Sequence, residues 1–415
     1  MDENNNIEAV NNPSSSGIFF RLLSNKKLLL GALIILVLLV IFAVFSFFSI
    51  QKNNKIAQAR NDVYQKLKIG DYKGAQEAAK KGLAIKKDDE YLIKNFINAV
   101  SSQGNKTGKE IDALKISEPY IKELLKGNNS ADDLLTAGYA YETAGQYEKA
   151  LTYYENSISK NPKLSEAYFH KGHVLAFLNR ESESQQAYER AYELDPNNPL
   201  IILMKATILN KNNSPDDSLN LLLKVGDNES FDKDIRAESY TAASLLEMNR
   251  GNNLESKKYA EKAFRTGSEY STGTALYGYY IGQEKNRYNE GIGYLTSAIK
   301  QNPRITFNYL LLGILLRTYN YPKQAVIIQK EGLDRIGEDN TIIGNSAKSA
   351  QKGKMYYEIA QTYSFVPDVD NSVKYLKLAI AENSLYESDI QKDLKTGYFN
   401  KIKINPIFVN FVNSK

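Results

Sequence analysis

The chain has 415 residues, of which 24% are charged and 42% hydrophobic, and its formal net charge is +5. This balance is typical of a folded, mostly helical protein and excludes a disordered or fibrous chain. The 53 basic residues nearly balance the 48 acidic ones, and no Lys/Arg block alternates with aromatics, so we expect no nucleic-acid partner. Because the chain has no Cys and only two His, disulfides and thiolate metal sites are excluded, and we expect no catalytic residue, cofactor or metal.

The first expected element is an apolar segment at residues 28–50, which follows a predicted disordered tail at residues 1–27. The segment carries no charge and, at about 1.5 Å per residue, is long enough to cross a hydrocarbon core about 30 Å thick. A cleavable signal peptide is the competing interpretation, but the segment exceeds a usual signal h-region and lacks a convincing small-residue cleavage site. The sequence therefore predicts one retained transmembrane helix and a single-pass membrane protein.

The orientation of this helix is not decided by its flanking charges. Basic residues stand on both sides of the segment, namely Arg21, Lys26 and Lys27 before it and Lys52, Lys55 and Arg60 after it. The positive-inside rule is therefore nearly balanced. A single amino-terminal span followed by a large domain most often exports that domain, so we expect the rest of the chain outside the cytoplasm.

The remainder of the chain repeats with a period of about 34 residues. Corresponding residues recur in two successive segments, namely Gly138, Gly145, Tyr154 and Pro162 in the first and Gly172, Asn179, Tyr188 and Pro196 in the second. These residues resemble the tetratricopeptide repeat, whose pattern is a helix-turn-helix with small residues in both helices, an aromatic residue in the second and Pro at its end. The resemblance indicates a repeat protein rather than an ordinary globular domain.

This resemblance implies an all-α fold, a right-handed α-solenoid of tetratricopeptide-like helix pairs preceded by one transmembrane helix. We expect the array at residues 56–386, with eight or nine units, and capping helices at residues 387–415. The pattern is best in four segments, at 131–164, 165–198, 272–305 and 306–339. It is poor at 90–130 and 199–236, where insertions leave the repeat count open.

Packing requirements explain where small and large residues stand in one repeat. Gly138 and Ala150 are expected on facing stripes of the two helices, where small side chains let the helix axes approach closely. Gly145 is expected to end the first helix, because glycine accepts a positive φ. Tyr154 is expected to fill the space between one helix pair and the next, and Pro162 stops the second helix.

In repeat arrays of this family the first helix of each pair lines a concave groove that usually holds a peptide. Aromatic and His side chains suit such a surface because they offer apolar contact with a polar tip. An alternative is that many of these aromatics only fill contacts between helices. The predicted groove residues are Tyr139, Glu142, Phe169, His170, His173, Phe177, Tyr277, Tyr280 and Arg317.

The sequence thus predicts a membrane-anchored scaffold that binds a partner protein or peptide in the groove, in the assembly of an envelope complex. A homo-oligomer is a further partner to consider. The alternative function is an enzyme or accessory factor acting on an envelope glycan or small molecule, although no phosphate loop or nucleophile motif is visible. His170 and His173 could join Glu142 at a metal, but no third His exists, and a plain pair of groove residues is preferred.

Overall fold

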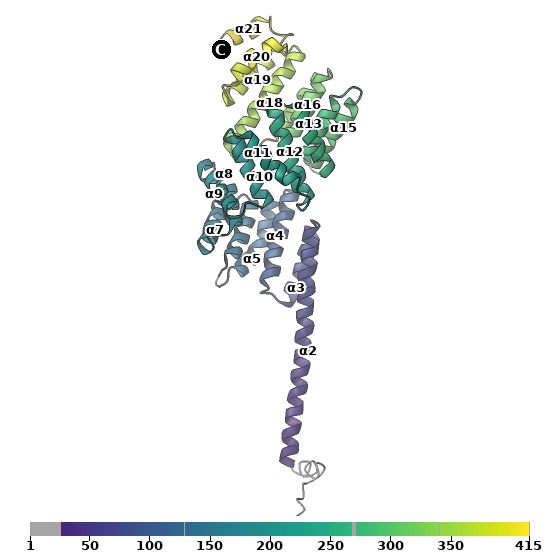
Figure 1. The fold of residues 1–415 in the computed structure, drawn as a ribbon, viewed down its shortest axis with the longest axis vertical. Helices are drawn as coiled ribbons and strands as arrows, with labels where there is room; N and C mark the ends of the chain where they lie inside the picture. The colour runs from purple at the N-terminus through teal and green to yellow at the C-terminus, as the bar shows by residue number, and fades with distance from the viewer. Residues whose placement is uncertain (1–25, 128, 268–270, 340, 415) are drawn as a thin grey trace, which may run out of the picture. The chain divides into compact units, whose positions relative to one another are not determined.

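The computed structural model describes residues 26–127, 129–267, 271–339 and 341–414. These residues form α-helices and no β-strand, which confirms the predicted fold class (Figure 1). Apart from Lys26 and Lys27, the predicted tail lies outside the described residues. The chain divides into two compact units, Met1–Asn128 and Asn129–Lys415, and each is considered by itself.

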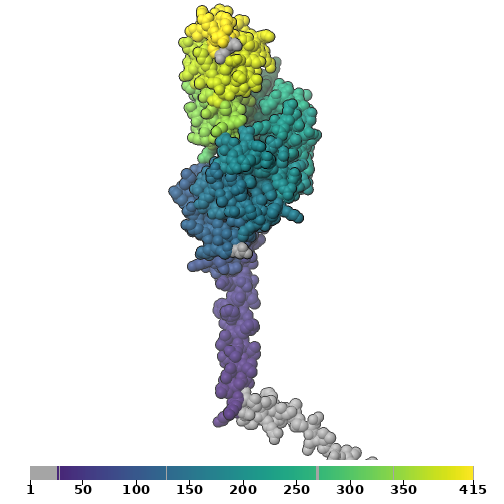
Figure 2. Space-filling model, turned by 90° about the vertical axis from the view of Figure 1, so that its left-hand side faces the viewer, coloured from purple at the N-terminus to yellow at the C-terminus, as the bar shows by residue number. Residues whose placement is uncertain are grey.

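The first unit is built on one long helix that continues from the apolar segment into the first helix pair. Its described helices are α2 (Lys26–Lys68), α3 (Tyr72–Ile85), α4 (Glu90–Thr107) and α5 (Glu110–Leu124). The carboxy-terminal part of α2 buries Ile56, Ala59 and Val63 in the unit, whereas its apolar part stands as a rod along which no described segment packs (Figure 2). By length and composition α2 can cross a membrane, although a signal sequence passes the same criterion.

The second unit is also built of antiparallel helix pairs. Its helices are α6 (Ala131–Thr143), α7 (Tyr147–Lys160), α8 (Ser165–Phe177), α9 (Glu181–Leu194), α10 (Pro199–Lys211), α11 (Pro215–Gly226), α12 (Lys233–Asn249), α13 (Asn253–Thr266), α14 (Ser271–Gly282), α15 (Tyr288–Gln301), α16 (Thr306–Thr318), α17 (Pro322–Asp334), α18 (Asn345–Phe365), α19 (Val369–Glu382), α20 (Tyr386–Thr396) and α21 (Pro406–Asn413). The poorly matching segment 199–236 still contains a regular pair, α10 and α11. Helix α21 buries Phe408 and Phe411 in the hydrophobic cluster of α18 and α19.

The turn inside each helix pair uses a residue with positive φ. Gly145 has a φ of 73°, as the sequence predicted, and Asn179 and Asn213 follow at the same period with φ of 59° and 61°. Asn286 and Asn320 repeat this geometry with φ of 66° and 65°. Asn is the residue other than Gly that best tolerates this left-handed conformation, which is why Asn replaces Gly without breaking the repeat.

Gly138 and Gly172, each in the first helix of a pair, lie directly under an aromatic ring of the second helix. An added Cβ at Gly138 would lie 2.5 Å from the Tyr154 ring, and one at Gly172 would lie 3.0 Å from the Tyr188 ring. The prediction that Tyr154 fills the space between one helix pair and the next therefore describes only part of its packing. Its ring packs within its own pair on Gly138 and also stacks on His170 of the next pair, with ring centroids 5.5 Å apart.

This contact makes Gly138→Ala an expected destabilising substitution. The new methyl group would meet a Tyr154 ring that is completely buried and cannot retreat, so the free energy of unfolding should fall by about 1–3 kcal/mol. Gly293→Ala is the control, because Gly293 lies in α15 with nothing within 4 Å of the added Cβ. That change should stabilise by about 0.5–1 kcal/mol. Urea unfolding followed by circular dichroism measures both, and a stabilising Gly138→Ala would contradict the contact.

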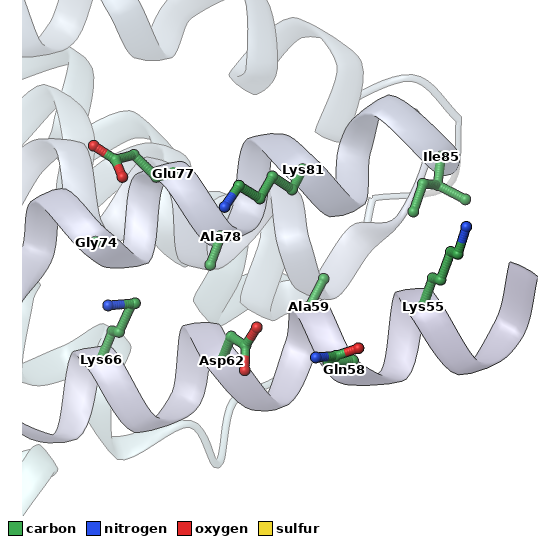
Figure 3. A pocket seen from close by; sticks show the side chains of 10 residues that line it. All are labelled: Lys55, Gln58, Ala59, Asp62, Lys66, Gly74, Glu77, Ala78, Lys81 and Ile85. Carbon is green, nitrogen blue, oxygen red and sulfur yellow. The ribbon is translucent and has the colours of Figure 1, made fainter.

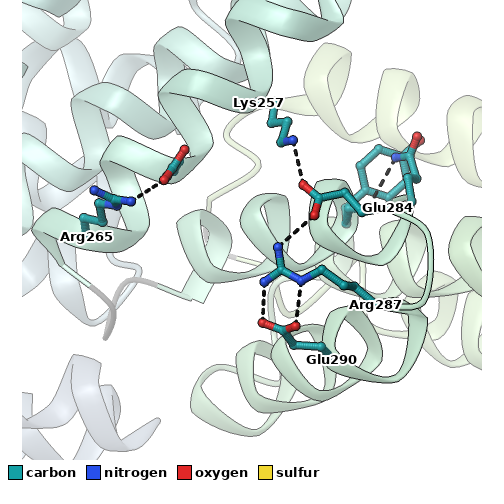
Figure 4. A network of polar contacts seen from close by, with 8 residues as sticks. Lys257, Arg265, Glu284, Arg287 and Glu290 are labelled. Carbon is teal, nitrogen blue, oxygen red and sulfur yellow. Dashed lines mark hydrogen bonds and ion pairs between the residues drawn. The ribbon is translucent and has the colours of Figure 1, made fainter.

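A network of charged side chains surrounds the turn between α14 and α15 (Figure 4). Arg287 donates to Glu284 at 2.8 Å and to Glu290 at 2.7 Å, and Lys257 of α13 donates to Glu284 at 2.7 Å. The four side chains are between 33% and 42% exposed. Because water screens such pairs, each contributes below about 1 kcal/mol, so the network orients the turn more than it stabilises the fold.

Candidate functional site

The local sequence fixes the start of α6. Ser130 Oγ accepts a hydrogen bond from the Asp133 N–H at 3.1 Å, and the Asp133 carboxylate accepts one from the Ser130 N–H at 2.8 Å. This reciprocal capping box satisfies two backbone N–H donors at the helix start. The acidic residues Asp132 and Asp133 also stabilise the helix, because the amino-terminal end of the helix dipole is positive. The helix then places Glu142 in its last turn, where the side chain faces α7 and α8.

Glu142 is the centre of a cluster that joins three helices. Its carboxylate lies 3.0 Å from Nδ1 of His170 and 2.5 Å from Nδ1 of His173, both on α8. Tyr154 of α7 donates its hydroxyl to the same carboxylate. Since an ionised carboxylate only accepts, Nδ1 of each ring carries the proton. We name Glu142, Tyr154, His170 and His173 the histidine cluster.

The histidine cluster keeps a buried carboxylate charged. The Glu142 side chain is 7% exposed, and burial alone would raise its pKa. The charge of His170 and the hydrogen bonds from His170 and His173 outweigh burial and lower the pKa of Glu142 to about 2. Burial would lower the pKa of His170, but the Glu142 charge raises it above its ordinary value, and burial followed by the Glu142 charge raises the pKa of Tyr154 well above 10.

Aromatic rings surround the two His side chains. The ring of Tyr139 stands edge-on to His170 at 5.6 Å, and that of Phe169 does so at 5.3 Å. Phe177 stands edge-on to His173 at 5.1 Å. All five side chains are partly exposed. The structure thus brings together six predicted residues from the first two well-matched repeats, and whether they touch a partner stays a prediction.

The other three predicted residues lie apart from the histidine cluster and are engaged inside the second unit. Tyr277 stacks on Phe264 with ring centroids 4.4 Å apart. Tyr280 is 7% exposed and donates its hydroxyl to Ser256. Arg317 has a side chain that is 5% exposed and pairs with Glu358 at 2.8 Å. Because Tyr280 and Arg317 are almost fully buried, a partner at the surface would contact little of either side chain. The proposed binding surface therefore excludes them.

The sequence raised the question whether His170, His173 and Glu142 could bind a metal ion together. Glu142 already bonds Nδ1 of both rings, so the hydrogen bonds account for how the three side chains meet. Among the residues that the structure describes, no group of three or more His, Asp or Glu side chains could hold a metal ion. The proposed role of His170 and His173 rests on their hydrogen bonds to Glu142.

The first unit contains a groove of about 410 Å³ between α2 and α3 (Figure 3). Lys55 and Ile85 lie at one end of the groove, the Lys81 ammonium group and Asp62 lie in its middle, and Glu77 lies towards the other end. Sequence reasoning used Lys55 only as an orientation signal and passed over this groove. The packing of α3 beside α2 brings these residues together.

The histidine cluster lies in the part of the chain that matches a known family. The family model described as "Tetratricopeptide repeat" matches residues 134–164 and 165–198. "Tetratricopeptide repeat protein 6" of Homo sapiens is 30% identical over 94 residues, which are 22% of this chain and 18% of that protein. "Small glutamine-rich tetratricopeptide repeat-containing protein 2" of Mycosarcoma maydis is 28% identical over 113 residues, 27% of this chain and 32% of that protein. The chain thus matches a third or less of the length of these curated relatives.

Solved structures share the helical architecture over more of the chain. Human IFIT1, solved as a dimer with PPP-AAAA, gives a TM-score of 0.50 at 13% identity and covers 86% of this chain and 92% of its own. A tetratricopeptide repeat protein from Parabacteroides merdae ATCC 43184 gives a TM-score of 0.44 at 19% identity, covering 63% of this chain and 99% of its own. At 13% identity the likeness to IFIT1 shows the fold alone.

Proposed function

The chain is a tetratricopeptide repeat protein, and on that premise we propose that it is a scaffold that binds a partner protein through the surface formed by α6 and α8. The single observation that carries the proposal is the histidine cluster with its ring of aromatics. Protein surfaces of this family serve protein interactions, and here two successive repeats present Tyr139, Phe169, His170, His173 and Phe177 side by side.

The histidine cluster is arranged before any partner arrives. The Glu142 carboxylate accepts hydrogen bonds from Nδ1 of both His rings, and the Tyr154 ring stacks on the His170 ring. Side chains that are already fixed lose little conformational entropy on binding, which raises the affinity that each contact delivers. Because Nδ1 is taken, Nε2 is the ring atom that each His offers to a partner, and the His173 side chain is 30% exposed.

The second part of the proposal is that α2 anchors the chain in a membrane. Its apolar part is long enough to span and has no share buried in the described residues. Anchoring would confine the binding surface to the membrane, so a partner in the same membrane meets it at a raised effective concentration. We propose that the chain acts there in the assembly of an envelope complex, with the repeats on the extracytoplasmic side.

Photo-crosslinking in intact cells tests the binding surface. A photoreactive amino acid in place of Tyr139 should give a discrete crosslinked protein band, because Tyr139 borders the histidine cluster. The same amino acid in place of Tyr321, which is 47% exposed elsewhere in the second unit, is the matched control and should not give that band. Adding His173→Ala should weaken the Tyr139 band by about tenfold, a typical effect of removing an interface contact of about 1.4 kcal/mol.

The outcomes separate the candidate functions. A band of twice the chain's own mass would identify a second copy as the partner. Identical bands from the positions of Tyr139 and Tyr321 would overturn the binding surface, and a nuclease-sensitive product would replace the protein partner with a nucleic acid. Turnover of an envelope glycan by the purified chain, without capture of a protein, would favour the enzymatic alternative.

A further inference from the structure

Helix α18 begins earlier than the repeat pattern requires. The first helix of a pair has 13 residues in α6, α8, α10 and α16, whereas α18 has 21 residues. Ser372 donates its hydroxyl to the Ala360 carbonyl at 2.9 Å, just as Ser184 donates to the Gly172 carbonyl at 2.7 Å. Ala360 of α18 and Gly172 of α8 therefore hold the same position in their repeats. Counted from this position, α18 carries an additional amino-terminal segment, residues 345–352, which we name the α18 extension.

The start of the α18 extension contacts a distant turn of the same unit. The Asn345 N–H donates to Oδ1 of Asn179 at 2.6 Å, although the two residues are 166 positions apart in the chain. An added Cβ on Gly344 would lie 3.2 Å from the Ala176 carbonyl oxygen. The start of α18 therefore lies beside the turn between α8 and α9 (Figure 1). Along the chain, four helix pairs lie between these two places.

This contact caps α18 with a side chain from another repeat. The first backbone N–H groups of a helix have no partner within the helix, and a side-chain oxygen usually accepts from them. The residue before α18 is Gly344, which has no side chain to do so. Asn179 supplies the acceptor instead, from the end of the helix that carries His170 and His173.

The α18 extension is also held to its own part of the array. The Gln351 amide donates to the Thr306 hydroxyl, at the start of α16, at 3.3 Å. Just before the extension, the buried Asp339 carboxylate accepts from the Thr306 N–H at 2.8 Å and from the Thr341 N–H at 3.0 Å. Because these bonds hold the extension to α16, separating Asn345 from Asn179 requires the helix pairs themselves to move apart.

We propose that the bond between Asn179 and Asn345 is a clasp that holds the second unit in one closed curvature, and that its release lets α8 and α18 move apart. In a repeat array each pair contacts mainly its neighbours, so small rotations between pairs add up along the array. A bond between pairs that are not neighbours limits this sum. One hydrogen bond at the surface contributes little net stability, so the clasp opens and closes reversibly. The closed clasp keeps α18 at a fixed distance from the histidine cluster.

Distance measurement between two spin labels on the full chain in detergent tests the clasp. The chain has no Cys, so the exposed positions of Ser182 in α9 and Lys352 in α18 can be labelled selectively as Ser182→Cys/Lys352→Cys. Double electron–electron resonance should give one narrow distance distribution. Adding Asn179→Gly removes the acceptor Oδ1, while Gly accepts the φ of 59° at this position. This variant should increase the fraction at longer distances about fivefold, as expected for the loss of one hydrogen bond.

Asn213→Gly is the matched control in the same labelled chain. Asn213 stands in the turn between α10 and α11 with a φ of 61°, so this variant makes the same change one repeat later. It should keep the narrow distribution. Equal broadening in the Asn179→Gly and Asn213→Gly variants overturns the clasp, because the effect would then follow the flexibility of a glycine turn. A distribution that is already broad without either change, or one that Asn179→Gly leaves narrow, also overturns it. None of these outcomes depends on whether the histidine cluster binds a partner.

Discussion

Tyr154→Ala is expected to lower the free energy of unfolding of the second unit by about 3–5 kcal/mol. The Tyr154 ring is completely buried, and it packs on Gly138 of α6 and on His170 of α8. Its removal leaves a cavity at the junction of two helix pairs and takes one of three hydrogen-bond donors from the buried Glu142 carboxylate. Urea unfolding of the full chain in detergent, followed by circular dichroism at 222 nm, measures the change.

Two further variants separate the packing of Tyr154 from its hydrogen bond. Tyr154→Phe keeps the ring and removes only the donor to Glu142, so it should lower the free energy of unfolding by about 1–3 kcal/mol. Tyr321→Ala removes a ring that is 47% exposed and should change the free energy by less than about 1 kcal/mol. If Tyr154→Phe were as damaging as Tyr154→Ala, the cavity would not be the main cause, and the packing of Tyr154 on Gly138 would be of little consequence.

The repeat itself could be predicted from the sequence because its determinants are local. The positive φ at Gly145 follows from its place between two helical segments, and Asn179 repeats it one period later. The contact of Gly138 with a ring of the following helix also depends on residues only 16 apart, Gly138 and Tyr154. Such short spacings leave few alternative arrangements, so a periodic pattern of small and large residues determines how one pair packs.

The histidine cluster was only half predictable, because it depends on how one pair sits on the next. Periodicity placed Glu142, His170 and His173 on the expected face of their helices. It could not predict that Glu142 would bond both rings and Tyr154 as well, since this requires α6, α7 and α8 to meet at one point. A Glu on one first helix followed by two His on the next, three residues apart, is the signal that could have indicated the cluster.

Tyr280 and Arg317 show the limit of reasoning from a helix face. Both stand at positions predicted for the groove, but neighbouring helices cover them. Tyr280 reaches Ser256 of α13, and Arg317 reaches Glu358 of the long helix α18. The helical period indicates the direction in which a side chain leaves its own helix. Whether that side chain is exposed depends on which neighbouring helices pack against that face. Which neighbours pack on Tyr280 and Arg317 depends on residues of α13 and α18, which lie 24 and 41 positions away in the chain.

Glu142→Gln is expected to lower the free energy of unfolding by about 3 kcal/mol, and by an amount that depends on pH. The raised pKa of His170 means that its contribution is complete below the ordinary value of 6.5 and is lost as the pH rises through the raised pKa. The lowered pKa of Glu142 means that its contribution is complete above 4.5 and is lost as the pH falls towards about 2. Both shifts describe one interaction, so the difference between wild type and variant should be largest between pH 4.5 and 6.5.

Urea unfolding of both proteins at pH 3, 5.5 and 8.5 measures this difference. The exposed residue Glu148 supplies the matched control, since Glu148→Gln removes the same charge close by and should change the free energy by less than about 0.5 kcal/mol. A constant difference between wild type and Glu142→Gln at all three pH values would show that the His rings do not hold the carboxylate by charge. The expected maximum near pH 5.5 would instead mean that the ion pair between Glu142 and the His rings stabilises the fold. The same ion pair keeps the two Nε2 atoms in place. A Glu142 variant should therefore bind the partner protein less well at the pH values at which it is less stable than the wild type.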